Sequence, residues 1–84
     1  EARKVRAELK ARIKMGSLTL RQVLDISDQN EIVSRTKVLA ILESMPKIGK
    51  VKARRLMESI GIAESRRLRG LGDQQRAALL AEFD

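Results

Sequence analysis

Apolar residues recur along most of this chain at spacings of three and four, the period of an amphipathic α-helix. The first such stretch covers residues 2–14, where the apolar positions are Ala2, Val5, Leu9 and Ile13. Basic residues occupy its other faces, and Gly16 follows it as a stop signal. No segment is a convincing strand, so the pattern predicts an all-α fold.

Four further helices are predicted, with short connections between them. Thr19 and Gln22 have the pattern of a capping box, in which each side chain accepts a hydrogen bond from the backbone of the other residue. The third helix carries the least charge, and we expect it to be central, with a buried stripe of Val38, Ile41, Leu42 and Met45. The predicted ranges are about 20–26, 31–45, 51–59 and 74–82, with Gly61 and Asp73 as caps of the last two.

The composition agrees with a single helical domain. The chain has 84 residues, of which 43% are hydrophobic but only 1% aromatic, so aliphatic side chains and methionine must build the core. Such a core favours packed helices over a β-sandwich. We therefore predict one small domain of about five helices, with a basic N-terminal helix or arm (residues 1–15) and a helical core (residues 16–84).

The residue inventory excludes most kinds of enzyme. Cysteine and histidine are both missing, which rules out disulfides, thiolate zinc sites, cysteine nucleophiles and histidine bases. The acidic residues are scattered, and Gly49-Lys50 lacks the G-x-x-x-x-G-K-[ST] pattern of a Walker loop. We therefore predict that the protein is not an enzyme and has no catalytic residue, metal or cofactor.

Nothing in the chain predicts a membrane or secretory location. No apolar run approaches the roughly 20 residues of a membrane-spanning helix. The first fifteen residues are basic and lack the apolar region of a signal peptide. The chain does not begin with methionine, so a preceding segment can be missing. We expect a reducing, soluble compartment.

The net charge of +7 is concentrated in two parts of the chain. Residues 1–15 contain six Lys or Arg against two Glu, a net charge of +4. Residues 47–69 contain eight against two, a net charge of +6, whereas residues 16–46 and 70–84 carry −1 and −2. Two positive patches are therefore expected, and such patches attract polyanions.

The turn around Gly49 has the features of a phosphate-binding site. Pro46 cannot continue the preceding helix, and Gly49 permits a positive φ and has no Cβ to obstruct a ligand. The next helix presents free N–H groups at its start, near Lys47, Lys50 and Lys52. We predict that this turn grips a nucleic-acid backbone, although a Gly-Lys pair between helices is commonly only structural.

Two further basic clusters accompany the turn. Arg66, Arg67 and Arg69 surround the apolar anchors Leu68 and Leu71, and crowding three arginines costs free energy without an anionic partner. The alternative is a solvated loop. The N-terminal helix is either a solvated amphipathic helix or a basic arm. As an arm, it would add a second DNA contact through Arg3, Lys4, Arg6 and Lys10.

Two segments, Lys37–Ala53 and Arg66–Gln75, resemble a known family. Residues 42–83 are similar to the helix-two-turns-helix (S13-like) module, which also occurs in small-subunit ribosomal proteins and certain DNA glycosylases. Over nearly its whole length the chain resembles the actinobacterial (mycobacterial-type) integration host factor, a nucleoid-associated family. The two segments in this order are specific, although neither is specific alone. Members of that family carry further N-terminal residues that are absent here.

The resemblance implies a non-catalytic, all-helical protein that binds duplex DNA with low sequence specificity and acts in chromosome compaction and phage site-specific integration. From the two positive patches we also infer that the protein could bend DNA or bridge two duplexes. We expect a monomer in the cytoplasm, at the nucleoid, without membrane association. A phage integrase or topoisomerase stays open as a partner in the same nucleoprotein complex. The predicted DNA-binding residues are Lys47, Ile48, Gly49, Lys50, Val51, Lys52, Arg54, Arg66, Arg67 and Arg69.

Two other functions stay open from the sequence. A phosphate cradle would serve structured RNA as well as DNA, as in the ribosomal relatives of the module. The apolar helix faces could instead dock another protein. Single-strand binding is disfavoured because no aromatic residue is available for stacking. Direct base readout is disfavoured because few Asn or Gln residues lie in the basic region.

Overall fold

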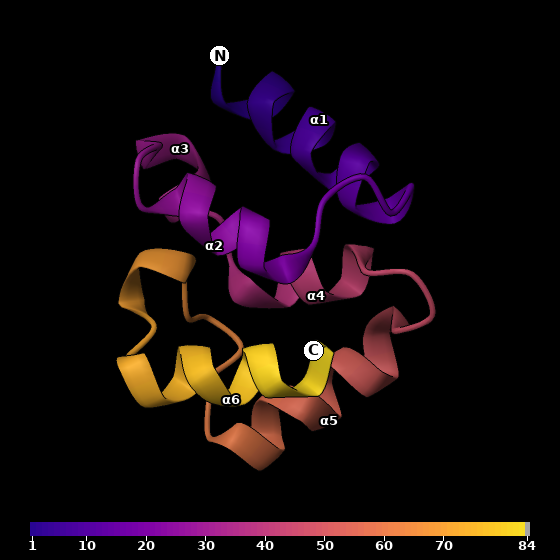
Figure 1. The fold of residues 1–84 in the computed structure, drawn as a ribbon, viewed down its shortest axis with the longest axis vertical. Helices are drawn as coiled ribbons and strands as arrows, with labels where there is room; N and C mark the ends of the chain where they lie inside the picture. Colours follow the sequence, from indigo (N-terminus) through magenta and orange to yellow (C-terminus); the bar gives the residue numbers. More distant parts are fainter. Residues whose placement is uncertain (84) are drawn as a thin grey trace.

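The computed structural model describes residues 1–83 and shows an all-α fold (Figure 1). Its elements are α1 (Ala2–Lys14), α2 (Leu20–Ser27), α3 (Glu31–Ser34), α4 (Val38–Ser44), α5 (Gly49–Ile60), the 3₁₀ turn η1 (Leu68–Gly70) and α6 (Asp73–Phe83). Within residues 1–83 there is no β-strand, and one isolated β-bridge joins Lys37 to Arg67. The predicted fold class is confirmed, with six α-helices in the described residues where about five were expected.

The helices form two groups on either side of α4. In Figure 1, α1, α2 and α3 lie above α4, and α5 and α6 lie below it. α4 contacts both α1 and α5, so this part of the predicted third helix is central, as expected. The core lies between the two groups and draws on every α-helix. Its members with 0% exposure are Ile13, Val23, Ile41, Leu42, Ala53, Met57 and Leu79.

The first two predicted helices are confirmed. α1 packs against α3 and α4 and buries Leu9 and Ile13, whereas Ala2, expected on the inward stripe, is exposed. α2 begins after a complete capping box. The Gln22 N–H donates to the Thr19 hydroxyl at 3.2 Å, and the Thr19 N–H donates to the Gln22 side-chain oxygen at 2.9 Å. This box satisfies two N–H groups that a helix start would otherwise leave without partners.

The prediction of one helix over residues 31–45 is wrong. The structure has α3 and α4 there, with a break between them. The Leu68 N–H donates to the Thr36 carbonyl at 3.0 Å, and the Val38 N–H donates to the Arg66 carbonyl at 2.9 Å. These backbone groups are therefore used by a distant segment instead of by a continuous helix. Periodicity within one segment cannot reveal such a partner.

α5 starts earlier than predicted and ends as predicted. It begins at Gly49, two residues before the expected start. Gly61 ends it with a φ of 87°, which confirms this glycine as the C-terminal cap. The Ile62 N–H donates to the Met57 carbonyl at 2.8 Å, and Ile62 is buried across the turn, as expected.

α6 is fixed at its start and along its length. The predicted N-cap role of Asp73 is wrong, because Asp73 is already helical and Gly72 precedes it. The Gly72 N–H donates to Oε1 of Gln75 at 3.0 Å. The Arg76 guanidinium donates two hydrogen bonds to the Asp28 carboxylate, at 3.0 and 3.1 Å. These bonds lower the pKa of Asp28 and raise the pKa of Arg76, and they hold α6 beside the end of α2.

Candidate nucleic-acid interface

The turn between α4 and α5 has two residues in the left-handed region. Met45 is extended (φ −67°, ψ 137°), as expected for a residue before proline. Lys47 has a φ of 70° and Gly49 a φ of 72°. Residues with a Cβ adopt this conformation at a cost, which Gly49 avoids. A Cβ added to Gly49 would meet no atom within 4 Å, so the space in front of this glycine is open.

The start of α5 is accessible to an anion. Ile48 is the N-cap residue, and its side chain makes no capping hydrogen bond, so the first N–H groups of α5 have no side-chain partner there. The helix dipole adds partial positive charge at the same point. Lys47, Lys50 and Val51 are exposed around it. This combination of free N–H groups, dipole and lysines favours phosphate.

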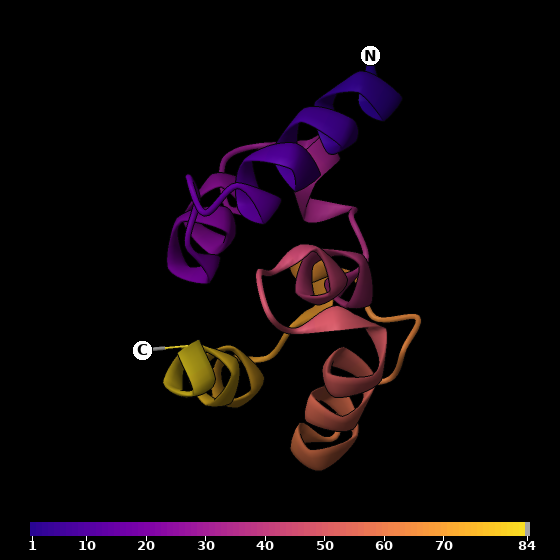
Figure 2. The ribbon, with the colours of Figure 1, turned by 90° about the vertical axis from the view of Figure 1, so that its right-hand side faces the viewer.

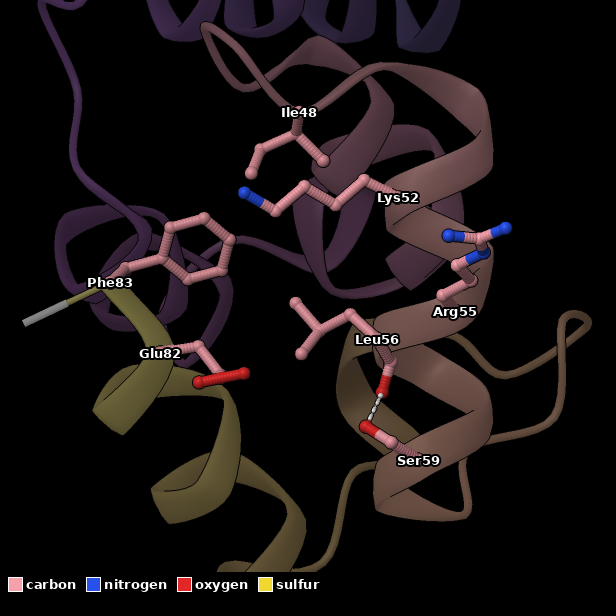
Figure 3. Close-up of a pocket in the computed structure, with 7 residues that line it drawn as sticks. All are labelled: Ile48, Lys52, Arg55, Leu56, Ser59, Glu82 and Phe83. Carbon is pink, nitrogen blue, oxygen red and sulfur yellow. Dashed lines mark hydrogen bonds between the residues drawn. The ribbon is translucent and has the colours of Figure 1, made fainter.

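Ile48 and Lys52 line a separate groove. Figure 3 shows both side chains in a groove between α5 and α6, with the Lys52 amine directed toward Ile48 and Phe83. The groove has a volume of about 450 Å³ and is lined by Ile48, Lys52, Arg55, Leu56, Ser59, Glu82 and Phe83. The Ser59 hydroxyl donates to the Leu56 carbonyl at 2.9 Å (Figure 3). Of the predicted residues in this turn, Lys47 and Lys50 therefore supply the amines beside the opening.

The segment that carries Arg66, Arg67 and Arg69, here called the arginine segment, is anchored as predicted by buried Leu68 and Leu71. Its backbone is also paired with the α3–α4 break, and Arg69 is exposed. The Arg66 guanidinium donates to the Gly70 carbonyl at 3.0 Å. A Cβ on Gly70 would lie 3.0 Å from the Arg66 side chain, so the glycine leaves room for this fold-back.

Arg67 joins the arginine segment to the N-terminal helix. Its Nη1 donates to the Arg35 carbonyl at 2.8 Å, which directs the guanidinium toward the α3–α4 break. Arg67 lines a hollow of about 220 Å³ together with Arg6 and Lys10 of α1. Arg3 lines a neighbouring hollow with the same two α1 residues. The structure therefore brings together residues from both predicted positive patches.

The remaining candidates are less closely grouped. The arginine segment is hydrogen-bonded to Val38, the first residue of α4. The turn at Gly49 follows Ser44, the last residue of α4, about 10 Å farther along that helix. Lys50 and Arg54 share a face of α5, and Arg54 Nε lies 3.3 Å from Glu64 Oε1, just before the arginines. Figure 2 shows α5, the orange segment before η1 and the N-terminal half of α1 toward one side, and α2 and α6 toward the other. Lys4 is exposed and lines neither hollow.

Sequence reasoning missed Arg35 and Lys37, which line the same hollow as Arg67. Both lie in a part of the chain whose net charge is −1, and both fall in the region expected to be one helix. No local signal marks them, because the hydrogen bond that closes the hollow joins residues 32 positions apart.

Two other kinds of site are not found in the described part of the chain. Among residues 1–83, no group of acidic residues is placed to hold a metal ion. No helix in this range has the length and apolar character needed to cross a membrane.

Known proteins show which family the chain is similar to. Residues 13–83 match the family described as the S13-like H2TH domain. The chain is 54% identical over 83 residues to the integration host factor of Mycolicibacterium smegmatis, an alignment that covers 99% of this chain and 79% of the relative. It is 48% identical to the integration host factor of Streptomyces coelicolor, over 98% of this chain and 77% of the relative.

A solved structure described as sIHF bound to an 8-base-pair palindromic DNA has the same fold, with a TM-score of 0.96. The two chains are 47% identical, and the alignment covers 99% of this chain and 93% of the other. The resemblance expected from the two sequence segments is therefore confirmed. The chain belongs to the S13-like helix-two-turns-helix family and, within it, to the integration host factors known from mycobacteria and Streptomyces.

Proposed function

We propose that this protein binds duplex DNA without catalysing a reaction, mainly through backbone phosphates. The observation that carries the proposal is the open start of α5. Gly49 has free space in front of it, no side chain caps the helix, and Lys47 and Lys50 are exposed beside it. N–H groups and the helix dipole favour an anion at this position. The DNA-bound relative supports the assignment of that anion to DNA.

The proposed interface extends from the turn along one side of the molecule. It comprises residues 47–52, Arg54 and the arginine cluster (Arg66, Arg67 and Arg69), with a second contact on α1 made by Arg3, Lys4, Arg6 and Lys10. Amines and guanidinium groups dominate these positions, and phosphate contacts position a protein on DNA without reading its sequence. Binding is therefore proposed to be strong on many sequences and selective for few.

Binding at several points on one side of a small domain would bend the duplex, and many such domains would compact a chromosome. We propose this role at the nucleoid, in the cytoplasm, with the protein acting as a monomer. In phage site-specific integration, the bent DNA would be the substrate that an integrase recognises. A topoisomerase is a second proposed partner in the same complex. Family membership supports these roles.

Salt dependence tests the phosphate mechanism directly. The affinity of the protein for fluorescein-labelled duplexes of about 20 base pairs, two helical turns, would be measured by anisotropy at several salt concentrations. If roughly five phosphates are neutralised, log K falls with log salt at a slope of about −4 to −5, for unrelated sequences alike. A slope near zero would exclude the mechanism. A duplex RNA competitor that displaces the DNA at equal concentration would instead assign the protein to structured RNA.

A further inference from the structure

A hollow between α1 and the α3–α4 break, here called the α1 hollow, is lined by five cationic side chains and no acidic one. Its volume is about 220 Å³. Three separate segments of the chain contribute to it. Its lining residues are Arg6 and Lys10 from α1, Arg35, Thr36, Lys37 and Ala40 around the break, and Arg67.

Little in the described residues neutralises this charge. Arg35 forms an exposed ion pair with Glu31, with Nη2 and Oε1 2.6 Å apart. Within residues 1–83, the other four cations of the hollow take part in no ion pair. Like charges held close together repel one another, so the hollow has a strongly positive potential in the absence of an anion.

Arg6, which lines the hollow, also carries an unsatisfied polar atom. Its Nε is buried and has no hydrogen-bond partner. Native proteins leave few buried polar groups unsatisfied, and each one calls for an explanation. A phosphate oxygen is a strong acceptor for a guanidinium group, because the hydrogen bond is charge-assisted.

The backbone around the hollow is fixed before any ligand arrives. Thr36 at its base accepts the Leu68 N–H through its carbonyl, and its hydroxyl donates to the Ile32 carbonyl at 3.2 Å. α1 is fixed opposite by buried Leu9 and Ile13. A backbone that is already ordered reduces the conformational entropy lost on binding.

We propose that the α1 hollow is a phosphate-binding pocket, and that it takes one backbone phosphate of the duplex held at the α5 turn. The inference deepens the proposed function and rests on it. The longest extent of the molecule is 33 Å, about one helical turn of B-DNA. The hollow includes Lys37, just before α4, and the α5 turn follows the end of α4, so the two sites lie about 10 Å apart along that helix. A single duplex along this side therefore reaches both sites within about ten base pairs.

A charge-matched pair of variants tests the pocket. Arg6→Gln/Lys10→Gln removes two cations from the hollow, whereas Arg12→Gln/Lys14→Gln removes two from α1 outside it. Both are compared with the wild type on a long duplex of about 20 base pairs. We expect the hollow variant to bind the long duplex on the order of tenfold more weakly, as for one charge-assisted contact. The magnitude of its salt slope should fall by about 0.9.

The control variant decides the outcome. The inference is overturned if both double variants weaken binding of the long duplex equally. A wild-type salt slope near zero would instead remove the proposed function. Thermal unfolding of both variants separates a loss of contact from a loss of fold.

Inorganic phosphate, titrated at constant ionic strength, tests the pocket without DNA. We expect the amide resonances of Lys37 and Arg67 to shift in the wild type and not in Arg6→Gln/Lys10→Gln. Phosphate that shifts Gly49 and Lys50 but leaves Lys37 and Arg67 unmoved would refute the pocket. Shifts in the hollow, combined with a long duplex that is indifferent to the variant, would overturn the assignment to DNA and indicate a small phosphate ester.

Discussion

Replacing Gly49 by alanine tests two features of the turn, the strain of its backbone through folding stability and the open space in front of it through DNA affinity. Gly49 has a φ of 72°, where alanine is strained by about 1–2 kcal/mol. Alanine also restricts the unfolded chain, which offsets about 0.4–1 kcal/mol of this strain. No clash adds to the cost, because the new Cβ meets nothing within 4 Å. The expected net loss is about 1 kcal/mol of folding stability, or about 4–8 °C in Tm.

Gly61→Ala and Gly16→Ala are controls with the same backbone penalty. Gly61 has a φ of 87° and Gly16 a φ of 80°, and a Cβ at either position also meets nothing within 4 Å. Neither residue belongs to the proposed interface. All three alanine variants should therefore lose about the same stability, which thermal unfolding followed by circular dichroism measures.

DNA affinity should distinguish Gly49→Ala from the two controls. A domain stable by about 5 kcal/mol remains almost entirely folded after losing about 1 kcal/mol, so reduced stability alone leaves the measured affinity unchanged. In the proposed complex, the added methyl group occupies space that the phosphate needs. We expect a loss on the order of tenfold or more for Gly49→Ala, about 1.4 kcal/mol, and no significant loss for the controls. Equal DNA affinity of the three variants in the anisotropy assay would refute the phosphate cradle.

Three further changes test other parts of the structure. Lys47→Gly should relieve the backbone strain at a φ of 70° and raise Tm by a few degrees, and a lower Tm would contradict the strain. The same change should lower the magnitude of the salt slope of DNA binding by about 0.9, because one cation is removed. Asp28→Asn should be less stable than the wild type at neutral pH. Because Arg76 lowers the pKa of Asp28 in the folded state, the gap should close as pH falls through and below about 3.9, and a gap unchanged in acid would exclude this cause. Charge reversal of the arginine cluster should weaken binding to unrelated duplexes alike in competition assays, whereas loss on one sequence alone would indicate base readout; the substitutions are Arg66→Glu, Arg67→Glu and Arg69→Glu.

The sequence predicted those features of the fold that are encoded locally. The capping box of Thr19, the αL cap at Gly61 and the buried anchors Leu68 and Leu71 each depend on residues within a few positions of one another. The positive φ of Gly49 was expected for the same reason, since only glycine adopts it without strain. Local signals therefore located the turn that carries the proposed function.

The features that the sequence did not predict depend on contacts between distant segments. Asp73 and Gly72 are both reasonable caps for α6, and the Gln75 side chain, by accepting from Gly72, favours the glycine. The hollow around Arg67 depends on α1, the α3–α4 break and the arginine segment at once. Charge counted along the chain found two patches, but it could not show that Arg67 lies beside α1.

The break between α3 and α4 explains how the two patches meet. In a continuous helix, the carbonyls of Arg35 and Thr36 would accept from residues one turn later and would be occupied. In the structure these carbonyls instead accept from Arg67 Nη1 at 2.8 Å and from the Leu68 N–H at 3.0 Å. Hydrogen bonding is thus maintained, and buried Leu68 stabilises the pairing. Folding thereby brings together the backbone segments that carry these five cationic side chains before an anion arrives, so a phosphate that enters the hollow meets positive charge on a backbone that is already ordered.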